Sequence, residues 1–333
     1  TAERTILSLI GQRYLHAGDY PNALKYASSA ERVATELGNP TQIAYMNNNI
    51  AKIHRELGNP EQALEMLQAV AEKMDRLDNA AGKAWAFKNI GDVYQDKKEL
   101  AKAKKLYGQA HDIMVDRGVR DGEGMALIGL GEIEWKRGRE REAMKFYDQA
   151  MKVFRAIEHH TGMGMVSRNL AEIARDNGNF IRAIEQYKTA VSHFQDGLIP
   201  IEAGKAHHAL GELYLSVSDY ENALTALQQA LEIRKSAGNT KQQLESLRHL
   251  GEVHFRKSDY RNALATLQAA LELATDKNDR MIVINRVADV YEAVGDKGKA
   301  VEQVLVALGH SRELGRRLDI VHNLKRVGKI YFD

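Results

Sequence analysis

Histidine pairs are the residues of this sequence that come nearest to a metal site. His208 and His249 stand at nearby positions of two successive segments with helical patterning, and His159 and His160 are adjacent in a predicted loop. A protein zinc site uses three or four ligands at defined spacing. No His-Glu-x-x-His motif occurs, and no carboxylate or third ligand has a defined spacing from His208 and His249. We therefore predict no metal site, and we expect His159 and His160 to be exposed.

Glycine-rich segments that could cradle a phosphate group are the second candidate for chemistry. The sequence contains no Gly-x-x-x-x-Gly-Lys-Ser/Thr motif. Gly122-x-Gly124 and Gly162-x-Gly164 follow predicted helices, whereas a dinucleotide-binding motif follows a strand, so we interpret these glycines as loop residues. Cysteine is absent, which excludes disulfides, cysteine-ligated zinc, iron–sulfur clusters and thiol nucleophiles. The sequence thus predicts no catalytic residue and no cofactor, and we expect the protein not to be an enzyme.

Acidic side chains mostly stand four residues from a basic one, which is the spacing of neighbours on a helix surface. Such pairs stabilise a helix by a few tenths of a kcal/mol, about 0.2–0.5 each. We predict surface ion pairs at Lys88/Asp92, Arg168/Glu172 and Arg248/Glu252.

The charge balance argues against several function classes. The chain of 333 residues carries 47 Lys and Arg against 45 Asp and Glu, a net charge of +2. We therefore predict no nucleic-acid partner and no membrane binding, because both need a dominant basic field. RNA binding by helical repeats would also need a recurring polar code. No apolar run approaches the roughly 20 residues that span a bilayer. Because cysteine is absent, we predict a cytoplasmic protein, although bacterial export is also compatible with that absence.

A small residue recurs every 40 residues, inside a Leu/Ile-Gly/Ala-x-x-Tyr pattern. Six equal steps of 40 are followed by one of 37 and another of 40. The recurring residues are Gly11, Ala51, Gly91, Gly131, Ala171, Gly211, Gly251, Ala288 and Gly328. A second series of alanines, from Ala23 to Ala300, lies twelve residues further on, and Gly-Asp or Gly-Asn turns fall between the two series. The small residues predict close crossings between paired helices.

Each period is therefore predicted to hold two helices joined by short turns, because Gly ends a helix and Asp or Asn begins the next. We expect helix A at about 41–57, 81–97, 121–137, 161–176, 201–216, 241–257 and 278–294, and helix B at about 61–77, 99–116, 140–156, 180–195, 220–236, 260–275 and 297–314. The predicted domain is a single solenoid with repeats at about 1–40, 41–80, 81–120, 121–160, 161–200, 201–240, 241–277 and 278–317, followed by a final helix at 318–333. Such a hairpin buries its apolar face only by stacking on its neighbours.

The step of 37 residues places a deletion of three near residues 275–279. We interpret this segment as a loop, where a change of backbone length costs little. The expected result is a tighter turn between the seventh and eighth repeats. The alternative is a hinge.

These motifs resemble the tetratricopeptide repeat family. Leu210-Gly211-Glu212-Leu213-Tyr214, Ser218-Asp219-Tyr220 and Ala223 carry the pattern clearly, as does Ile90-Gly91-Asp92-Val93-Tyr94. The period of 40 rather than 34, and the missing Pro near the end of helix B, resemble the long-helix branch of the family. The resemblance implies an all-α, right-handed superhelical solenoid of about eight helix-turn-helix repeats plus a final single helix. It also implies that helix A lines a concave face, which binds peptides or proteins.

The resemblance also implies which side chains face that groove. Asn amides suit a peptide backbone because one amide both donates and accepts, and Trp85 with Met125 and Met165 would offer an adaptable apolar strip. The predicted partner-binding residues are Tyr45, Asn48, Asn49, Lys52, Trp85, Lys88, Asn89, Met125, Glu132, Met165, Arg168, Asn169, His208, Glu212 and Arg248. The set does not match the family's two-carboxylate clamp for a free C-terminus, so we expect a mixed-charge internal segment as ligand. The alternative is that these charges form an ion-pair lattice between neighbouring A helices.

Two functions follow from these observations. The first is a protein- or peptide-binding scaffold. The second is a regulatory or sensor segment that controls a signalling enzyme or a transcription factor. The sequence begins in a helix A and stops in a helix A without its partner, whereas solenoids normally end in polar caps. We therefore expect an excised part of a larger protein, with a covalently attached effector domain outside this chain.

Overall fold

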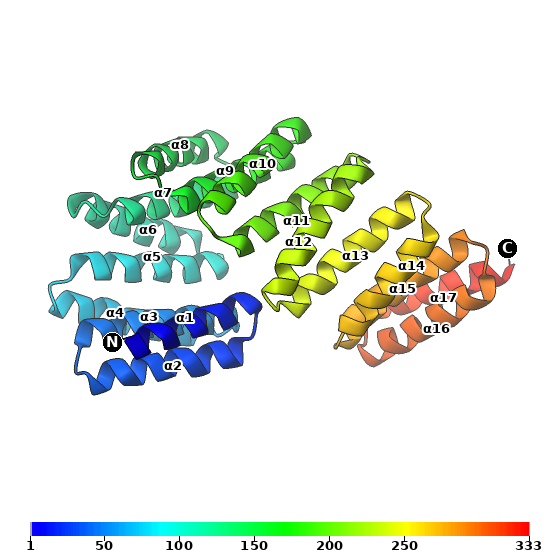
Figure 1. Ribbon diagram of the computed structural model, residues 1–333, viewed down its shortest axis with the longest axis horizontal. Helices are drawn as coiled ribbons and strands as arrows, with labels where there is room; N and C mark the ends of the chain where they lie inside the picture. The colour runs from blue at the N-terminus through cyan, green and yellow to red at the C-terminus, as the bar shows by residue number, and fades with distance from the viewer. Residues whose placement is uncertain (1, 333) are drawn as a thin grey trace. The chain divides into compact units, whose positions relative to one another are not determined.

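The computed structural model describes residues 2–332, and over this range the chain is a succession of seventeen α-helices without a strand (Figure 1). The helices are α1 (Ala2–Ala17), α2 (Tyr20–Glu36), α3 (Pro40–Glu56), α4 (Pro60–Arg76), α5 (Ala80–Asp96), α6 (Leu100–Asp116), α7 (Arg120–Lys136), α8 (Glu140–Ala156), α9 (His160–Asp176), α10 (Phe180–Asp196), α11 (Pro200–Ser216), α12 (Tyr220–Ser236), α13 (Thr240–Arg256), α14 (Tyr260–Leu273), α15 (Lys277–Ala293), α16 (Lys297–Glu313) and α17 (Arg317–Phe332). The all-α fold and the predicted helix boundaries are confirmed, the latter to within two residues.

The turns between helices follow the predicted chemistry. A residue with positive φ ends the helix, for example Gly18 at 75° and Gly58 at 79°. Where the sequence has no glycine, Asp78, Ser218 or another residue takes the same conformation. In many turns the next residue caps the following helix, as when the Asp19 side chain accepts from the Asn22 N–H. Such turns satisfy backbone groups at both helix ends. The residues that precede α4, α6, α7 and α8 make no such side-chain bond.

The short step in the repeat has a different origin from the predicted one. Helix α14 has 14 residues, whereas α12 and α16 have 17, so the three missing residues are the last turn of a helix and not part of a loop. Ala274 ends α14 in an extended conformation, with φ −74° and ψ 101°. No residue with positive φ occurs between α14 and α15 within the described chain. The deletion therefore replaces the usual left-handed turn with an extended one.

The small residues of helix A make room for large side chains of helix B. A Cβ atom added to Gly91 would lie 2.7 Å from Cε1 of Tyr107, and one added to Gly131 would lie 2.7 Å from Cε1 of Tyr147. Both tyrosines are fully buried. The crossings are close, as predicted, but the nearest atoms at these two glycines belong to an aromatic ring rather than to the recurring alanine.

Four glycines that we interpreted as loop residues lie inside helices. Gly122 and Gly124 belong to α7, and Gly162 and Gly164 belong to α9. A Cβ on Gly162 would come within 2.5 Å of the Phe154 ring. The loop interpretation is therefore wrong: these positions are small because helix-B side chains pack against the first turns of helix A.

The contacts divide the chain into two compact units, which meet in sequence between Ala203 and Gly204. Within the first unit, α3, α5, α7 and α9 contact one another in order, and each packs on its own helix B. In the second unit, α13 contacts α15 in the same way. Consecutive A helices thus form a row inside each unit. None of the described helices is both long and apolar enough to cross a membrane.

Candidate partner-binding surface

The predicted asparagines lie on the A-helix row, where three of them bond to neighbouring helices. Asn89 of α5 donates to Oδ1 of Asn48 on α3 at 2.7 Å. Asn169 of α9 donates to Oε1 of Glu132 on α7 at 3.0 Å. Asn89 and Asn169 are buried, at 3% and 5% exposed. These amides therefore hold successive A helices together in the present structure.

Charged side chains on the same row form a lattice of pairs. Asp92 is its best example, because the Lys88 ammonium lies 2.8 Å away, the Arg55 guanidinium 3.4 Å away, and the Tyr107 hydroxyl donates to it at 2.8 Å. The Arg55 pair joins α3 to α5. Asp92 thus ties two A helices and one B helix together.

Two of the three predicted ion pairs are present. Lys88 pairs with Asp92, and Arg168 lies 3.8 Å from Glu172 and 2.7 Å from Glu202 of α11. The third predicted pair, Arg248 with Glu252, is wrong. Glu252 pairs with Arg256 at 2.7 Å and with Arg286 at 3.3 Å rather than with Arg248. Arg286 belongs to α15, so this pair again joins consecutive A helices.

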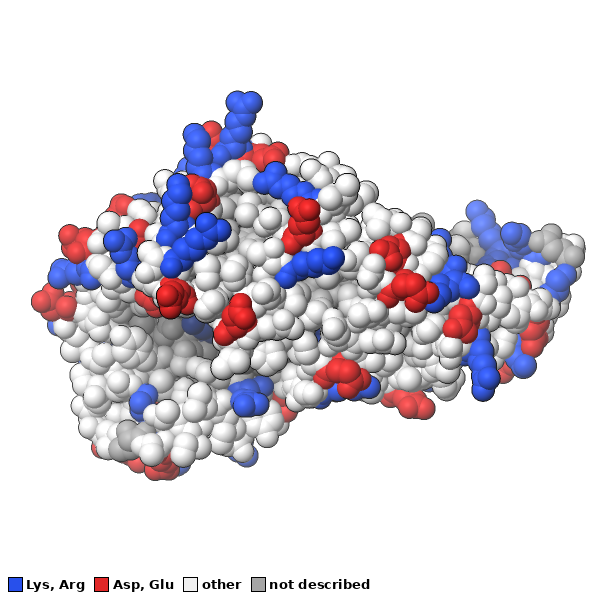
Figure 2. All heavy atoms as spheres, turned by 45° about the horizontal axis from the view of Figure 1, so that its top comes forward, with Lys and Arg blue, Asp and Glu red and all other residues white. Residues whose placement is uncertain are grey.

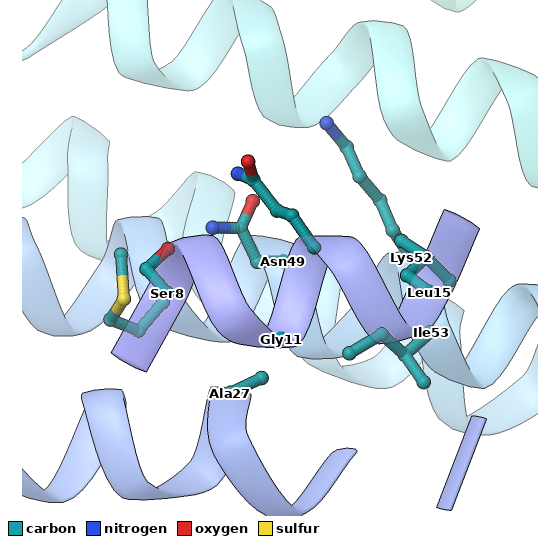
Figure 3. A pocket seen from close by; sticks show the side chains of 9 residues that line it. Ser8, Gly11, Leu15, Ala27, Asn49, Lys52 and Ile53 are labelled. Atoms are coloured by element: carbon teal, nitrogen blue, oxygen red, sulfur yellow. The ribbon is translucent and has the colours of Figure 1, made fainter. Parts of the chain in front are cut away.

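Lys52 differs from these residues because no hydrogen bond or ion pair reaches its ammonium within the described chain. It lines a cavity of about 340 Å³ between α1, α2 and α3, together with Asn49, Leu15 and Met46 (Figure 3). Figure 3 shows the Lys52 side chain extending away from the helix that carries it. The Asn49 side chain also makes no hydrogen bond to another described residue. Both polar groups are therefore available to a ligand.

A second cavity of about 260 Å³ adjoins the first on the other side of Lys52. Its lining includes Tyr45, Asn48 and Trp85, from α3 and α5. Tyr45 is exposed and Trp85 is half-buried. Met125 and Met165, the other members of the predicted apolar strip, each pack against the core of α7 to α9. The structure thus gathers Tyr45, Trp85 and Lys52 at one place.

The electrostatics at Lys52 are unfavourable for its charge. Burial and, after it, the nearby Lys88 ammonium lower the pKa of Lys52 to about 8, while Asp92 acts in the opposite direction. A buried cation without a partner favours its neutral form. An anionic group placed in either cavity would compensate this charge.

His208 and His249 occupy a buried hydrogen-bonded chain in the second unit. The Arg234 guanidinium donates to Nδ1 of His208 at 3.0 Å, and Nε2 of His208 lies 3.2 Å from Nδ1 of His249. Because a guanidinium only donates, His208 accepts at Nδ1 and carries its proton on Nε2. Nε2 of His249 then faces Oε1 of Glu212 at 3.4 Å.

The pKa values of both histidines are low. Burial and the Arg234 charge lower the pKa of His208 to about 2, and burial and the Arg248 charge lower that of His249 to about 4. Both rings are therefore neutral at physiological pH. The structure brings in a carboxylate, Glu212, that sequence spacing did not indicate. However, both nitrogens of His208 already make hydrogen bonds, and His208 is only 5% exposed.

Arg234 and Ser246, which belong to the same hydrogen-bonded network as His208, were not predicted from the sequence. Arg234 is 5% exposed and donates to Oγ of Ser246 at 2.6 Å. In other repeats the position of Arg234 holds Met74, Met114 or Phe154, all buried. An arginine at a repeat position that is otherwise apolar is the sequence signal that would have identified Arg234.

Charged side chains of both signs are interspersed over the face drawn in Figure 2. This distribution agrees with the balanced composition of the chain.

Comparisons with known proteins agree on the fold. The sequence profile of the tetratricopeptide repeat matches residues 2–68, 42–114, 122–196 and 202–276. No curated protein matches the sequence of this chain.

Three solved structures are similar in fold. BtubC (BKLC) from P. vanneervenii is 22% identical with a TM-score of 0.56, covering 64% of this chain and 90% of that one. A Signal Transduction ATPase with Numerous Domains (STAND) protein from Pyrococcus horikoshii, which has a tetratricopeptide repeat sensor, is 16% identical with a TM-score of 0.67; the match covers 94% of this chain and 52% of that one. A Rap protein complexed with Competence and Sporulation Factor is 13% identical with a TM-score of 0.56, covering 99% and 98%.

Proposed function

Because the chain belongs to the tetratricopeptide repeat family, we propose that it is a non-catalytic scaffold that binds a peptide segment of another protein along α1, α3 and α5. The proposal rests on the observation that Lys52 has no partner in the described chain and lines two adjoining cavities. Asn48, Asp92 and Asn169 on the same row are instead bonded to neighbouring helices. The proposed site is therefore narrower than the full predicted set and includes Tyr45, Asn49, Lys52 and Trp85.

The chemistry of the two cavities describes the ligand. Leu15, Met46 and Ile53 supply apolar surface to the first cavity, and Trp85 supplies an aromatic ring to the second. The Asn49 amide can both donate to and accept from a peptide backbone, and Lys52 favours a carboxylate. We expect an internal peptide segment that carries apolar side chains around one acidic residue.

The other residues of the predicted set have a different proposed role. Asn48, Lys88, Asn89, Glu132, Arg168 and Asn169 make inter-helix or intra-helix pairs. We propose that they mainly fix the spacing of the A helices and so shape the groove. A ligand could reach them only by exchanging these pairs for its own.

A regulatory role is the second proposal, and the fold similarities favour it. One similar structure is a STAND protein with a repeat sensor, and another is a Rap protein complexed with a factor. This chain spans about half the length of the STAND protein. In this proposal, peptide binding controls an effector domain attached to the chain in a cytoplasmic signalling protein.

The test begins with selection of random displayed peptides on the wild-type protein, followed by calorimetric titration of the selected peptides. We expect Lys52→Glu and Asn49→Ala to weaken binding by about tenfold or more, since each removes a group that the ligand would use. Lys145→Glu, on the exposed side of α8, is the matched charge control and should bind as wild type. Undiminished affinity in both groove variants, with unchanged melting temperatures, would contradict the proposed site.

A further inference from the structure

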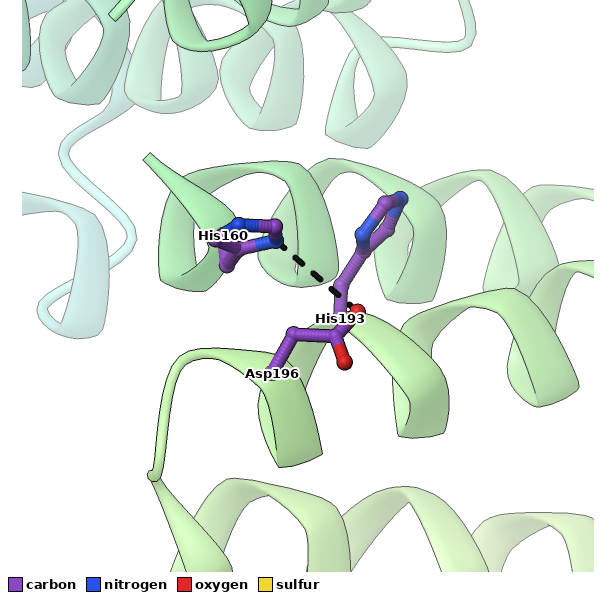
Figure 4. A group of neighbouring side chains, drawn as sticks. All are labelled: His160, His193 and Asp196. Carbon is purple, nitrogen blue, oxygen red and sulfur yellow. Dashed lines mark ion pairs between the residues drawn. The ribbon is translucent and has the colours of Figure 1, made fainter. Parts of the chain in front are cut away.

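Three side chains with metal-binding chemistry meet at one end of the α9–α10 hairpin (Figure 4). Helix α9 begins at His160, and His193 and Asp196 occupy the last turn of α10. The two helices are antiparallel partners, so the start of one lies beside the end of the other. One donor atom from each of the three side chains lies within 4.8 Å of the others. This cluster is separate from the proposed peptide site.

One nitrogen of each imidazole in this cluster, Nδ1, has no hydrogen-bond partner in the described part of the chain. Nδ1 of His160 and Nδ1 of His193 are both shielded from solvent and unbonded. Nδ1 of His160 faces Oδ2 of Asp196 at 3.9 Å, beyond hydrogen-bonding distance. A buried polar atom left without a partner is unfavourable. A metal ion would satisfy these groups together.

The donor groups in this cluster suit a metal ion. A neutral imidazole and a carboxylate are the forms that bind metals. The cluster of His208, His249 and Glu212 differs, because Arg234 occupies Nδ1 of His208 and His249 occupies its Nε2.

We propose that His160, His193 and Asp196 form a binding site for a divalent transition-metal ion such as Zn²⁺. Two imidazoles and one carboxylate make an open site, in which water or a group from a partner takes the fourth position. Ligand bonds of about 2.0–2.1 Å place tetrahedral donors about 3.3 Å apart, so the donor atoms must approach one another by up to about 1.5 Å.

The side chains of this cluster can make that movement. The side chains of His160 and Asp196 are 42% and 55% exposed and stand at helix ends. Rotation of exposed side chains costs little, and the exposure also gives the ion a path from solvent. The bound ion would link the first residue of α9 to the last residue of α10.

The test uses the full chain after dialysis against a chelator, with Zn²⁺ as the probe in calorimetric titration. We expect about one equivalent to bind and to raise the melting temperature, since a ligand that binds only the folded state stabilises it. His160→Ala, His193→Ala and Asp196→Asn should each weaken Zn²⁺ binding by about tenfold or more. His111→Ala should leave the binding unchanged, because His111 lies outside the cluster.

His249→Ala separates this proposal from its nearest competitor. Binding that survives His160→Ala and His193→Ala but disappears in His249→Ala would assign the ion to the other cluster and overturn the proposal. Absence of Zn²⁺ binding to the wild type would also overturn it. The visible spectrum of bound Co²⁺ gives a second readout. If His193→Ala does not fold, Asp196→Asn and His160→Ala carry the test, because both positions are at helix ends.

Discussion

His249 and His208 stay neutral in the folded protein because burial and neighbouring guanidinium groups oppose their protonation. Their pKa values of about 4 and about 2 lie below the usual value of about 6.5. Between pH 6.5 and 4 the unfolded chain therefore binds protons that the folded chain does not. The free energy of unfolding must fall as the pH drops through this window.

We expect the loss to be about 1–2 kcal/mol for His249 between pH 6.5 and 5. Urea unfolding of the wild type and of His249→Gln at both pH values measures it. The variant should show a shallower pH dependence, because Gln does not titrate. Equal slopes in the two proteins would show that His249 is protonated as easily in the folded state as in the unfolded one.

Lys52 changes stability with the same sign as the histidines, but at higher pH. Its pKa of about 8 is below the usual value of about 10.5, so the unfolded chain holds the proton more strongly between these pH values. The contribution of this group to stability therefore rises as the pH increases from 8 to 10.5. At pH 7, Lys52→Met should be neutral or stabilising by about 0–1 kcal/mol, since it removes an unpaired, partly buried cation.

Thermal unfolding of Lys52→Met beside Lys145→Met measures this effect. The exposed Lys145 is the control and should change the melting temperature little. A large loss of stability in Lys52→Met alone would mean that the ammonium has a partner in the folded protein, and would weaken its proposed availability to a ligand.

The crossing of helix A over helix B depends on the absence of a Cβ at Gly91. An Ala there would place its Cβ 2.7 Å from Cε1 of Tyr107, which is buried and hydrogen-bonded to Asp92. We expect Gly91→Ala to destabilise the protein by about 1–3 kcal/mol through overpacking.

Gly108→Ala is the matched control. Gly108 lies in the middle of α6, and an added Cβ would meet no atom within 4 Å. The same substitution there should stabilise by about 0.5–1 kcal/mol, because Ala favours a helix interior. Opposite signs in chemical denaturation would separate steric fit from helix propensity. A stabilising Gly91→Ala would show that Tyr107 moves aside easily.

The turn between α14 and α15 is the place where the 37-residue step allowed a hinge as an alternative. Asp276 caps α15 through the Asp279 N–H at 2.9 Å, and the Ala274 N–H bonds to the Ala270 carbonyl at 3.1 Å. Ala274 is also buried. With its end groups bonded in this way, we expect amide exchange at residues 274–278 to match that of the turn at residues 294–296. Markedly faster exchange at 274–278 would support the hinge.

The helices were predictable because their signals are local and repeated. Gly18 with Asp19, and the same pair types one period apart, mark ends and starts that depend on a few neighbouring residues. The shortened α14 was misplaced because the count of 37 gives the size of a deletion and not its position. Gly162 was misread as a loop residue because its small size is set by Phe154, which contacts it from another helix.

The candidate site was only partly predictable for a related reason. The family pattern identified Lys52 and Trp85, and the structure gathers them at adjoining cavities. The pattern could not show that Asn89 is bonded to Asn48, because that bond spans two repeats. Likewise, His193 and His160 meet only because an antiparallel hairpin brings its two ends together. Such pairs depend on packing between helices rather than on position within one.

Within each unit, the contacts between described helices join mainly helices that are adjacent or two apart along the chain. Stability in such an array is the sum of local and nearest-neighbour contributions. A substitution in the core should therefore weaken its own repeat and those adjacent, while distant repeats keep their protection. Leu267 of α14 is suited to this test, because it is 1% exposed and packs against Gly251 of α13.

We expect Leu267→Ala to remove about 2–5 kcal/mol of local stability by leaving a cavity. Hydrogen exchange followed by mass spectrometry should show faster exchange in α13 to α16 and unchanged exchange in α3 to α6. Ala263 and Ala270, which flank Leu267 in the same helix, are already small, so the cavity should not be filled by their rearrangement. Equal loss of protection across α3 to α16 would show that the chain unfolds as one cooperative unit, which nearest-neighbour contacts alone would not produce.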